Sequence, residues 1–498
     1  MNLFVGLKLF DLRSALLGAV VFLILFRYLR RRRWNLPPGP TGWPGIGYVP
    51  HLALTGEEPH VAFSKLVPKY GNIISVNLAG HLVVVLHGFT TIREAFNQQQ
   101  FSARPRMYTS EKVRPGVGVI TSSGDVWTEI RRFSLTVLRG LGVGKSSFED
   151  NIAAEAEFLM EDWTKYEGAA FDPRHSIANA VSNVICSVVF GRRFQYNDAV
   201  FRRMLECNDD IVERAGSGGA IEFSSLLARL TFLPFIRDYI ATVRQSYNQI
   251  RSMVVRHNQD YDADNPRDFI DAYLQHQQAK ERQGCEASVF DMDNLTNLVS
   301  DLFFAGSETT TTTLRWMLLY MMIYPEVQAR VHKELDAVTG RNRFPRLGDK
   351  PDLPYTEAVI CELQRITTIA PLAVPHACLE DTKLLGYDIP KGTILVSNLW
   401  HDHFDPTVWE EPNVFRPERF LDRDGKVVRR EEINPFGIGR RICLGEHLAR
   451  MELFIFITFL LHQFTFKKPQ DAPPLTLRGI NFGTWSPVEF KVCAIPRV

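Results

Sequence analysis

The chain has 498 residues, of which 57 are lysine or arginine, 56 are aspartate or glutamate and 45% are hydrophobic. Its net charge of +1 excludes the basic excess that is typical of nucleic-acid-binding proteins, so no nucleic-acid partner is expected. Its seven cysteines, an odd number without a Cys-x-x-Cys pair, argue against a disulfide framework or zinc ribbon and favour a reducing compartment.

The N-terminal 33 residues differ in character from the rest. An uncharged run from Ser14 to Phe26 is followed by a cluster of arginines up to Arg33. The run is shorter than the roughly 20 residues that span a bilayer, but an extension back to Leu3 reaches that length and includes three charged side chains. Positive charge marks the cytoplasmic side, so we expect an uncleaved membrane anchor over residues 1–33. A cleaved signal peptide is the alternative, although no small-residue cleavage site follows the run.

A proline-rich stretch over residues 34–50 comes next, with Pro37, Pro38 and Pro40 around Gly39. Prolines stiffen the chain and cannot continue a helix, so this stretch predicts a semi-rigid hinge. No long linker interrupts the remainder, and residues 51–498 are predicted to form one large domain.

The predicted elements of this domain begin with two strand-like runs, 73–78 and 81–86, which flank Ala79-Gly80 and predict a hairpin. A polar, glycine-containing stretch over 277–288 predicts a surface loop. Short strand patterns return at 383–385 and 394–396. The fold class is therefore mainly α with a minor β region. Apolar periodicity predicts helices over 91–98, 125–139, 147–166, 294–323, 325–339, 355–367 and about 445–461.

The most informative stretch is Phe436-Gly-Ile-Gly-Arg-Arg-Ile-Cys-Leu-Gly445, in which Cys443 directly precedes an apolar helix. A helix N-terminus and a nearby arginine both favour thiolate over thiol. Gly439 and Gly445 would let a flat ligand approach the backbone, and Arg441 offers a cation to an anionic group on that ligand. A thiolate in this setting suits an axial haem ligand. The alternative for an isolated cysteine is an inert buried thiol.

The spacing Phe-x-x-Gly-x-Arg-x-Cys-x-Gly resembles the cysteine loop of the cytochrome P-450 superfamily, specifically its animal microsomal family 2 enzymes. The resemblance covers nearly the whole chain. It implies the cytochrome P-450 fold and a haem b cofactor, whose iron has Cys443 as its axial ligand and which Phe436, Arg441 and Gly445 help to bind. It also implies a monooxygenase that uses dioxygen, with electrons from NADPH delivered by NADPH–cytochrome P-450 reductase.

A second motif, Ala305-Gly-Ser-Glu-Thr-Thr310, lies in the middle of the longest predicted helix. Glycine within a helix costs about 1 kcal/mol, and the Thr309 hydroxyl is spaced to bond or displace the Ala305 carbonyl. We therefore expect a local opening of the helix with a polar notch. By the resemblance, Thr309 and Glu308 form the catalytic acid–alcohol pair on the dioxygen side of the haem, and Ala305 lies against the cofactor. A kink with satisfied polar groups is the alternative.

Glu362 and Arg365 lie at positions i and i+3, on one face of a predicted helix. The resemblance implies that Arg419, from the later Phe-Arg-Pro-Glu-Arg-Phe motif, joins them in a buried structural network near the cysteine loop. Solvated charges on two separate faces are the alternative for either motif alone.

Trp127 and Arg131 are hydrogen-bond donors four residues apart, and they suit a carboxylate. The resemblance implies that they contact the haem propionates together with Arg104, His376 and Arg441. For Arg104 and His376, an ordinary surface position is the alternative.

The substrate pocket is implied only by family position. Its surrounding segments are largely apolar, which suits lipophilic substrates such as fatty acids, steroids or xenobiotics. The predicted pocket residues are Ile120, Phe304, Ala305, Ala370, Val374 and Phe482.

A basic patch on the cysteine side of the haem is expected to steer an acidic flavoprotein, the reductase. Cytochrome b5 is a second expected partner. Solvated basic residues on helices are the alternative to such a patch. Its predicted members are Arg131, Arg132, Arg139, Lys145, Arg429, Arg430 and Arg440.

Together these features predict a haem-thiolate monooxygenase that is anchored in the endoplasmic reticulum membrane, faces the cytosol, and hydroxylates or epoxidises a lipophilic substrate. One alternative is a family member that rearranges peroxides without reductase or dioxygen, which the presence of Glu308 and Thr309 disfavours. The other is a non-catalytic haem-binding sensor or lipid carrier.

Overall fold

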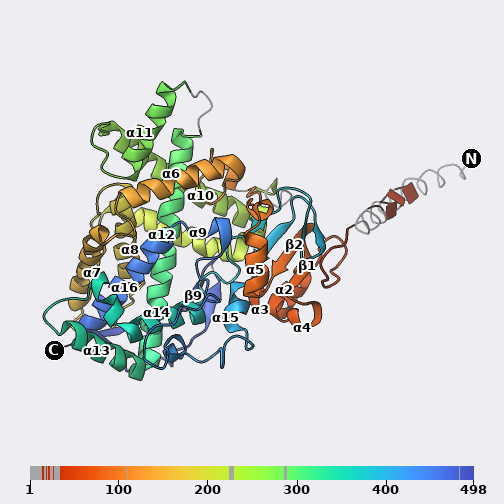
Figure 1. The fold of residues 1–498 in the computed structure, drawn as a ribbon. Coiled ribbons are helices and arrows are strands. Elements are labelled where there is room, and N and C mark those ends of the chain that lie inside the picture. The colour runs from red at the N-terminus through yellow and green to blue at the C-terminus, as the bar shows by residue number, and fades with distance from the viewer. Residues whose placement is uncertain are drawn as a thin grey trace, which may run out of the picture.

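A small β-rich region and a larger bundle of helices lie on opposite sides of the molecule (Figure 1). The computed structural model describes residues 14–15, 18–19, 21–22, 26, 34–108, 110–223, 229–284, 289–481 and 483–497. Most of the predicted anchor, and the predicted pocket residue Phe482, lie outside these ranges. Among the described residues, no helix has the length and apolar character needed to cross a membrane.

The β-rich region contains a four-stranded sheet of order β1–β2–β6–β3. β1 (Ile73–Leu78) and β2 (His81–Leu86) form the predicted antiparallel hairpin, with Ala79 in its turn at a φ of 50°. β6 (Ile394–Ser397) runs parallel to β2, and β3 (His376–Ala377) pairs antiparallel with β6. The near-continuous apolar runs of β1 and β2, rich in isoleucine and valine, suit a sheet that is covered on both faces.

Three further strand pairs complete the β structure. Each is antiparallel, and each joins segments of the C-terminal half. They are β4 (Thr382–Leu384) with β5 (Tyr387–Ile389), β7 (Phe464–Lys467) with β10 (Cys493–Pro496), and β8 (Gly479–Asn481) with β9 (Trp485–Pro487).

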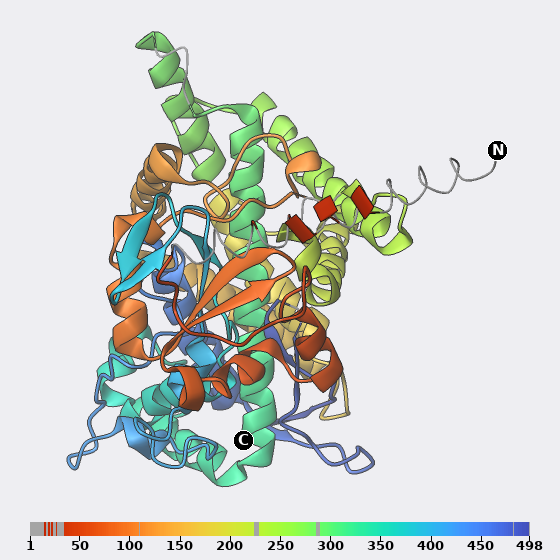
Figure 2. The same cartoon turned by 90° about the vertical axis from the view of Figure 1, so that its right-hand side faces the viewer.

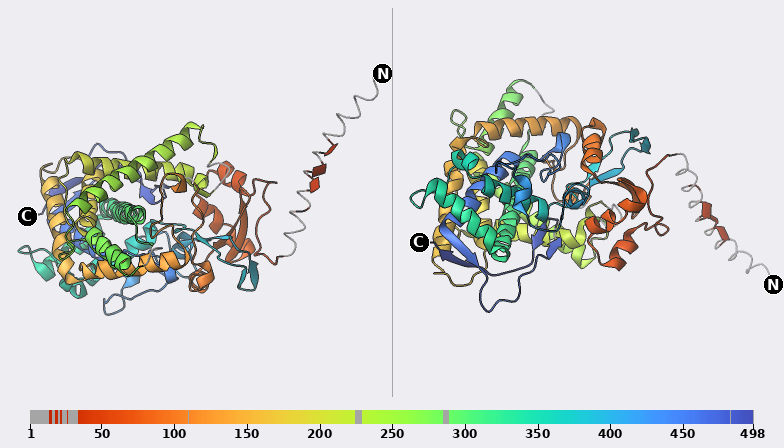
Figure 3. Two further views of the ribbon diagram at one scale, coloured as in Figure 1. Left: turned by 90° about the horizontal axis from the view of Figure 1, so that it is seen from above. Right: turned by 60° about the horizontal axis from the view of Figure 1, so that its bottom comes forward.

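The helical bundle is organised around α12 (Met292–Ile323), which the other helices surround in Figure 2 and in the left panel of Figure 3. The Asp291 side chain caps its N-terminus by accepting a hydrogen bond from the Asn294 amide at 2.7 Å. Most residues of α12 beyond Ser307 are buried, as expected of a helix with neighbours on every side. The helices packed against it include α8 (Arg174–Val189), α10 (Pro234–Gln259), α14 (Pro354–Thr367) and α16 (Glu446–Gln463).

Most predicted helices are present with ends that differ by only a few residues, and α13 (Pro325–Thr339) matches its predicted range. The predicted helix over 147–166 is η3 (Ser146–Phe148) followed by α7 (Glu149–Thr164). The remaining helices are α2 (Val49–Thr55), α3 (Pro59–Ser64), α4 (Val67–Tyr70), α5 (Phe89–Phe96), α6 (Gly124–Gly140), α9 (Ala199–Phe223), α11 (Phe269–Arg282) and α15 (Leu399–Phe404).

The surface loop predicted over 277–288 is wrong in its first part, because α11 continues to Arg282. Its polar residues are good helix formers, and the Gln277 side chain donates a hydrogen bond to Glu281 one turn later at 3.0 Å. Lys280 and Arg282 in the last turn also complement the helix dipole. Residues 285–288 lie outside the described part of the chain.

The proline-rich stretch is attached to the body along much of its length. The Ser75 amide and hydroxyl of β1 donate hydrogen bonds to the Pro38 and Pro37 carbonyls at 2.9 and 2.6 Å. A Cβ atom on Gly39 would lie 1.8 Å from the Ser75 carbonyl oxygen, so only glycine fits this approach. The stretch is therefore packed against the sheet instead of forming a free joint.

Candidate functional site

The loop before α16 holds the Cys443 sulfur in a defined orientation. Gly439 has a φ of 78°, and a Cβ atom there would lie 2.2 Å from the Phe96 carbonyl oxygen, so the chain requires glycine at this turn. The Cys443 amide donates to the Phe436 carbonyl at 2.9 Å. Gly445 forms the N-cap of α16 and donates its N–H to the Cys443 thiol.

The expected preference of Cys443 for the thiolate does not come from the chain alone. Part of the residue is exposed, yet burial by the surrounding chain raises the pKa of the thiol, and the Glu446 carboxylate adds to this effect. The Gly445 N–H and Arg131 act in the opposite direction and are outweighed. A coordinated metal ion deprotonates a thiol outright, so this cysteine suits a metal that supplies the missing positive charge.

Three guanidinium groups gather beside the cysteine loop without a carboxylate partner in the described part of the chain. Burial and the neighbouring arginines lower the pKa of Arg441 to about 8 and that of Arg104 to about 10. Burial also lowers the pKa of Arg131, whose Nη2 donates to the Ile442 carbonyl at 2.7 Å. Cations that destabilise one another in this way indicate a site for an anion.

Two further predicted residues border this cationic cluster. The Trp127 indole N–H is buried without a hydrogen-bond partner, and its ring lies 4.0 Å from the Arg441 guanidinium carbon. The His376 Nδ1 lies 2.8 Å from the Phe101 carbonyl, and its ring stacks on Phe96. Burial and the nearby Arg104 lower the pKa of His376 to about 3, so it is neutral at pH 7.

The sheet brings two of these residues together across a long sequence separation. An isolated bridge joins Ala103 to Ala377, so Arg104 and His376 lie side by side at the sheet edge. Arg104 donates to the carbonyls of Ile120, Val374 and Pro375 at 3.2, 2.8 and 2.8 Å. Two predicted pocket residues thus lie directly beside the cationic cluster.

The residues present fit haem b. A thiol of defined orientation matches the axial ligand, and the unpartnered indole N–H with three uncompensated guanidiniums matches the two propionate carboxylates. Because Gly439 lets the cysteine loop pack closely against Phe96, the loop leaves room for a flat ring system beside it.

The residues Glu362, Arg365 and Arg419 lie in one buried network. The Arg365 Nε and Nη2 donate to the two Glu362 oxygens at 2.7 and 2.8 Å, and the Arg419 Nε donates to Glu362 at 3.0 Å. The Glu362 and Arg365 side chains are fully buried, and Arg419 is 4% exposed. Arg365 also donates to the His403 and Pro412 carbonyls, so the network ties α14 to the chain that leads to the cysteine loop.

On α12, the Thr309 hydroxyl donates to the Ala305 carbonyl at 2.8 Å, as predicted. The expected opening of the helix is not present, because α12 is continuous from Met292 to Ile323. The hydroxyl adds a bond to the carbonyl without displacing it. Gly306 packs closely against α8, since a Cβ atom there would lie 2.4 Å from the end of the Ile185 side chain, which would have to shift. Phe304 and Ala305 are half-buried one turn before Thr309.

Glu308 faces a polar cavity of about 380 Å³ between α8, α9, α12 and β9. Its Oε1 accepts hydrogen bonds from the Thr312 and Thr484 hydroxyls, both at 3.0 Å. Burial raises its pKa, since no cation of the described residues bonds to the carboxyl directly. The cavity is also lined by Arg174, Ser182, Asp209, Glu213, Arg315 and Ser486 among others.

The remaining predicted pocket residues have partly exposed positions. Ile120 and Ala370 are half-buried, and Val374 is 49% exposed. Ala370 belongs to a turn closed by the Ala373 amide, and the adjacent Ile369 carbonyl accepts the Trp485 amide of β9 at 2.8 Å. The region around β9 therefore approaches the predicted pocket, although Phe482 itself lies outside the described residues.

One staple, the bonds that join Arg114 and Ile120 to Asp301, was not predicted from the sequence. It links α12 to the loop before α6. The Arg114 Nη2 donates to Asp301 at 3.1 Å, and its Nε donates to Asn297 at 2.7 Å. The second Asp301 oxygen accepts the Ile120 amide at 2.9 Å. This loop also supplies the Ser122 and Val119 carbonyls that bind Arg441, so Asp301 supports the cationic cluster indirectly. Its partners are far apart in sequence, and no local motif marks them.

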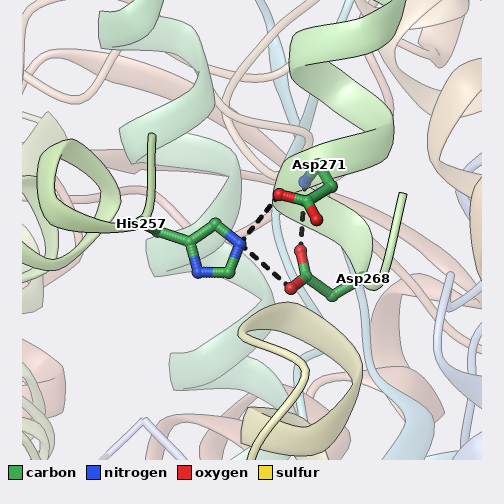
Figure 4. A group of neighbouring side chains, drawn as sticks. All are labelled: His257, Asp268 and Asp271. Atoms are coloured by element: carbon green, nitrogen blue, oxygen red, sulfur yellow. Dashed lines mark hydrogen bonds and ion pairs between the residues drawn. The ribbon is translucent and has the colours of Figure 1, made fainter. Parts of the chain in front are cut away.

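A separate group of His257, Asp268 and Asp271 has the residue types of a metal site (Figure 4). The His257 Nε2 lies 3.0 Å from one oxygen of each aspartate. Arg267, however, donates to both Asp271 oxygens, at 2.6 and 3.1 Å, so this carboxylate is already paired with a cation of the chain. We interpret this group as an ion-pair cluster that ties α10 to the start of α11.

The cysteine loop, the cationic cluster beside it and the mainly helical fold are those of a haem-thiolate protein. The Cytochrome P450 family model matches residues 37–494. The chain is 43% identical to Cytochrome P450 2J3 of Rattus norvegicus, over 98% of this chain and 97% of that protein. It is 41% identical to Cytochrome P450 2J2 and 40% identical to Cytochrome P450 2U1 of Homo sapiens, over 98% and 96% of this chain and 96% and 93% of those proteins.

The chain therefore belongs to the cytochrome P450 family, and its relatives are family 2 members. It is a monooxygenase that acts on lipophilic substrates and holds haem b through a cysteine thiolate. Like the family, it uses dioxygen with electrons from NADPH that arrive through a reductase.

Proposed function

We propose that this chain inserts one oxygen atom into a lipophilic small molecule, a fatty acid, steroid or xenobiotic, with Cys443 as the iron ligand. The observation that carries the proposal is a group of three guanidiniums with no carboxylate partner among the described residues, together with the unbonded Trp127 indole N–H, beside the Cys443 loop. The guanidiniums are those of Arg104, Arg131 and Arg441. His376 completes this set once an anion is present. Phe436 and Gly445 hold the loop on either side of the sulfur.

Haem, when bound, supplies the activation of dioxygen, so that one oxygen atom enters the substrate and the other leaves as water with two electrons and two protons. The protein supplies the proton path. Glu308 collects a proton from the polar cavity, and its raised pKa favours the protonated form. Thr309, the next residue, has its hydroxyl bonded to the Ala305 carbonyl and would pass the proton on toward the dioxygen that haem would hold.

The ligand assignment is tested by Cys443→His, with Cys493→Ser, a half-buried cysteine of β10, as the matched control. The reduced carbon monoxide complex of the control should keep the absorption band of a thiolate ligand, and that of Cys443→His should lose it. The same band in Cys443→His protein would overturn the assignment.

The proton path is tested by Thr309→Ala. This variant should release more hydrogen peroxide per NADPH consumed than the wild type, measured with dodecanoic acid and testosterone as probe substrates. An unchanged peroxide yield with either probe would remove the threonine from the mechanism. NADPH-independent turnover of a lipid hydroperoxide would favour the peroxide-rearranging alternative, and haem binding without oxygen uptake would favour a sensor or carrier.

For the redox partner, we propose that NADPH–cytochrome P-450 reductase docks on the predicted basic patch, with cytochrome b5 as a second partner. Arg132, Arg139, Lys145, Arg429 and Arg440 are all exposed, which supports this docking. Arg440→Glu should slow reductase-dependent reduction several-fold, and Arg478→Glu, outside the patch, should not. Equal rates in both variants would contradict the patch. The microsomal relatives support attachment to the endoplasmic reticulum membrane through residues 1–33, with the catalytic domain over 51–498 in the cytosol.

A further inference from the structure

One carboxyl group lies inside the most apolar helix of the molecule. α16 is buried along nearly its whole length, and Glu452 in its first half is 1% exposed. The other buried polar residues of α16 are Thr458, whose hydroxyl bonds to its own helix, and His462 near the C-terminal end. Glu452 is therefore the only buried acidic residue of α16, and it faces α12.

The contacts of Glu452 are few. Its Oε2 lies 2.9 Å from the Thr310 hydroxyl of α12, and its Oε1 is buried without a hydrogen-bond partner. Within the described part of the chain, no lysine, arginine or histidine pairs with it, and no other titratable group measurably influences it. Burial raises the pKa of this carboxyl to about 8, which the Thr310 bond offsets only in part.

A neutral carboxylic acid is therefore the form that the fold favours at pH 7. Burial of such a group with one partner costs free energy relative to an apolar side chain of the same size. The cost is offset only through the contact that the group makes. That contact joins α16, the helix that begins directly after the cysteine loop, to the helix turn that carries Thr309.

Thr309, Thr310 and Thr313 differ in the bonds that their hydroxyls make. The hydroxyls of Thr309 and Thr313 donate to carbonyls one turn back within α12, at 2.8 and 2.9 Å. The Thr310 hydroxyl instead leaves the helix and meets Glu452. Because Thr309 and Thr310 are adjacent, a restraint on Thr310 also sets the rotation of α12 at Thr309.

We propose that Glu452 is a positioning residue for Thr309: its carboxyl holds Thr310 against α16 and thereby fixes the direction of the Thr309 hydroxyl. This inference rests on the proposed role of Thr309. It assigns Glu452 no contact with substrate or cofactor.

The test measures the C–O stretching band of the reduced carbon monoxide complex by infrared spectroscopy, because this band responds to hydrogen bonds near the bound gas and needs no substrate. Thr309→Val defines the shift that results from loss of the hydroxyl. Glu452→Leu and Thr310→Val should each shift or broaden the band. Glu452→Gln, which keeps a neutral hydrogen-bonding group, should restore the wild-type band. Thr458→Val, a buried threonine of α16 with only a local bond, is the matched control and should leave the band unchanged.

A pH titration separates positioning from simple packing. The wild-type band should move as the pH rises through about 8 and the carboxyl ionises, whereas the band of Glu452→Gln should stay fixed. If Thr309→Val shifts the band but Glu452→Leu and Thr310→Val do not, the inference is wrong and the role of Thr309 stands. If Thr309→Val itself has no effect on the band and Thr309→Ala none on peroxide release, the proposed role of Thr309 fails first.

Discussion

Buried carboxyl groups occur in two different settings on the two sides of the site. Near the cysteine loop, Glu362 is fully buried and bonded to the guanidiniums of Arg365 and Arg419. On α12 and α16, Glu308 is partly buried and Glu452 is buried, and among the described residues both bond to threonine hydroxyls and not to a cation. The first arrangement compensates a fixed charge, and the second favours a proton on the acid.

The ion-paired carboxylate therefore has a structural role, and the carboxyls that bond to hydroxyls are suited to binding and releasing protons. The Glu362 carboxylate bonds to Arg365 and Arg419, and Arg365 also bonds to backbone carbonyls of the later loop, so this network joins α14 to that loop. A carboxyl held by hydroxyls changes its protonation state at a smaller cost. Asp301 is intermediate, with one arginine and backbone amides as partners.

Glu362→Ala is expected to have the largest effect. It leaves two buried guanidiniums without a carboxylate, which should cost about 3–5 kcal/mol of unfolding free energy and leave little haem-loaded protein. Denaturant unfolding and the haem-to-protein absorbance ratio measure both quantities. Glu410→Ala, which breaks the exposed pair with Arg416, is the control and should behave like the wild type. Normal haem loading in Glu362→Ala would show that the network is not needed to hold the haem.

Asp301→Asn should have the next largest effect, about 1–3 kcal/mol, because Arg114 loses its carboxylate in a buried position. The released loop should also show faster hydrogen exchange at the Ile120 amide. Asp293→Asn, on the same helix but paired with Arg251 near the surface, is the control. Equal losses in the two variants would show that the staple adds nothing beyond an ordinary exposed pair.

His257→Gln should reduce stability by about 1–2 kcal/mol near pH 6 and by less at higher pH. Burial opposes protonation of His257, but Asp268 and Asp271 outweigh it, so its pKa is raised. This stabilisation is fully present below the unfolded pKa of about 6.5 and is lost as the pH rises through the folded value. Unfolding free energies from pH 5 to 9 measure the difference. A zinc-dependent rise in the wild-type melting temperature, absent from His257→Gln, would contradict the ion-pair interpretation.

Glu308→Gln should have the smallest effect on stability, less than about 0.5 kcal/mol at pH 5, since glutamine resembles the protonated acid. Because the folded pKa of Glu308 is raised, the folded state binds the extra proton and wild-type stability falls as the pH rises above the unfolded value. The variant should show a shallower fall. If both proteins lose stability in parallel, Glu308 is ionised in the fold and the contrast with Glu362 disappears.

Local patterns in the sequence predicted the parts of the fold that depend on neighbouring residues. The β1–β2 hairpin, α13 and the cysteine loop are all set by turn residues and by short periodic runs. The Thr309 bond to Ala305 was predictable for the same reason. The first part of the loop predicted over 277–288 is wrong, because its polar residues are good helix formers and α11 continues to Arg282.

The long-range parts could not be predicted from the residues alone. Arg114 and Asp301 are 187 positions apart, and nothing near either one indicates the other. The bonds of Thr484 and Thr312 to Glu308 depend on how β9 docks on α12. Glu452 did carry a signal, since a single acidic residue interrupts a long apolar run in α16, but its partner Thr310 is visible only in the fold.

The attachment of the proline-rich stretch has a mechanical consequence. Pro37 and Pro38 are bonded to Ser75, while Asn35 exchanges hydrogen bonds with Asp388 of the β4–β5 hairpin at 2.8 Å in both directions. A force on the chain ahead of Asn35 would be transmitted through these bonds to the sheet, and it would rotate the whole catalytic domain. The tilt of the enzyme toward whatever surface holds its N-terminus is then set by these few bonds.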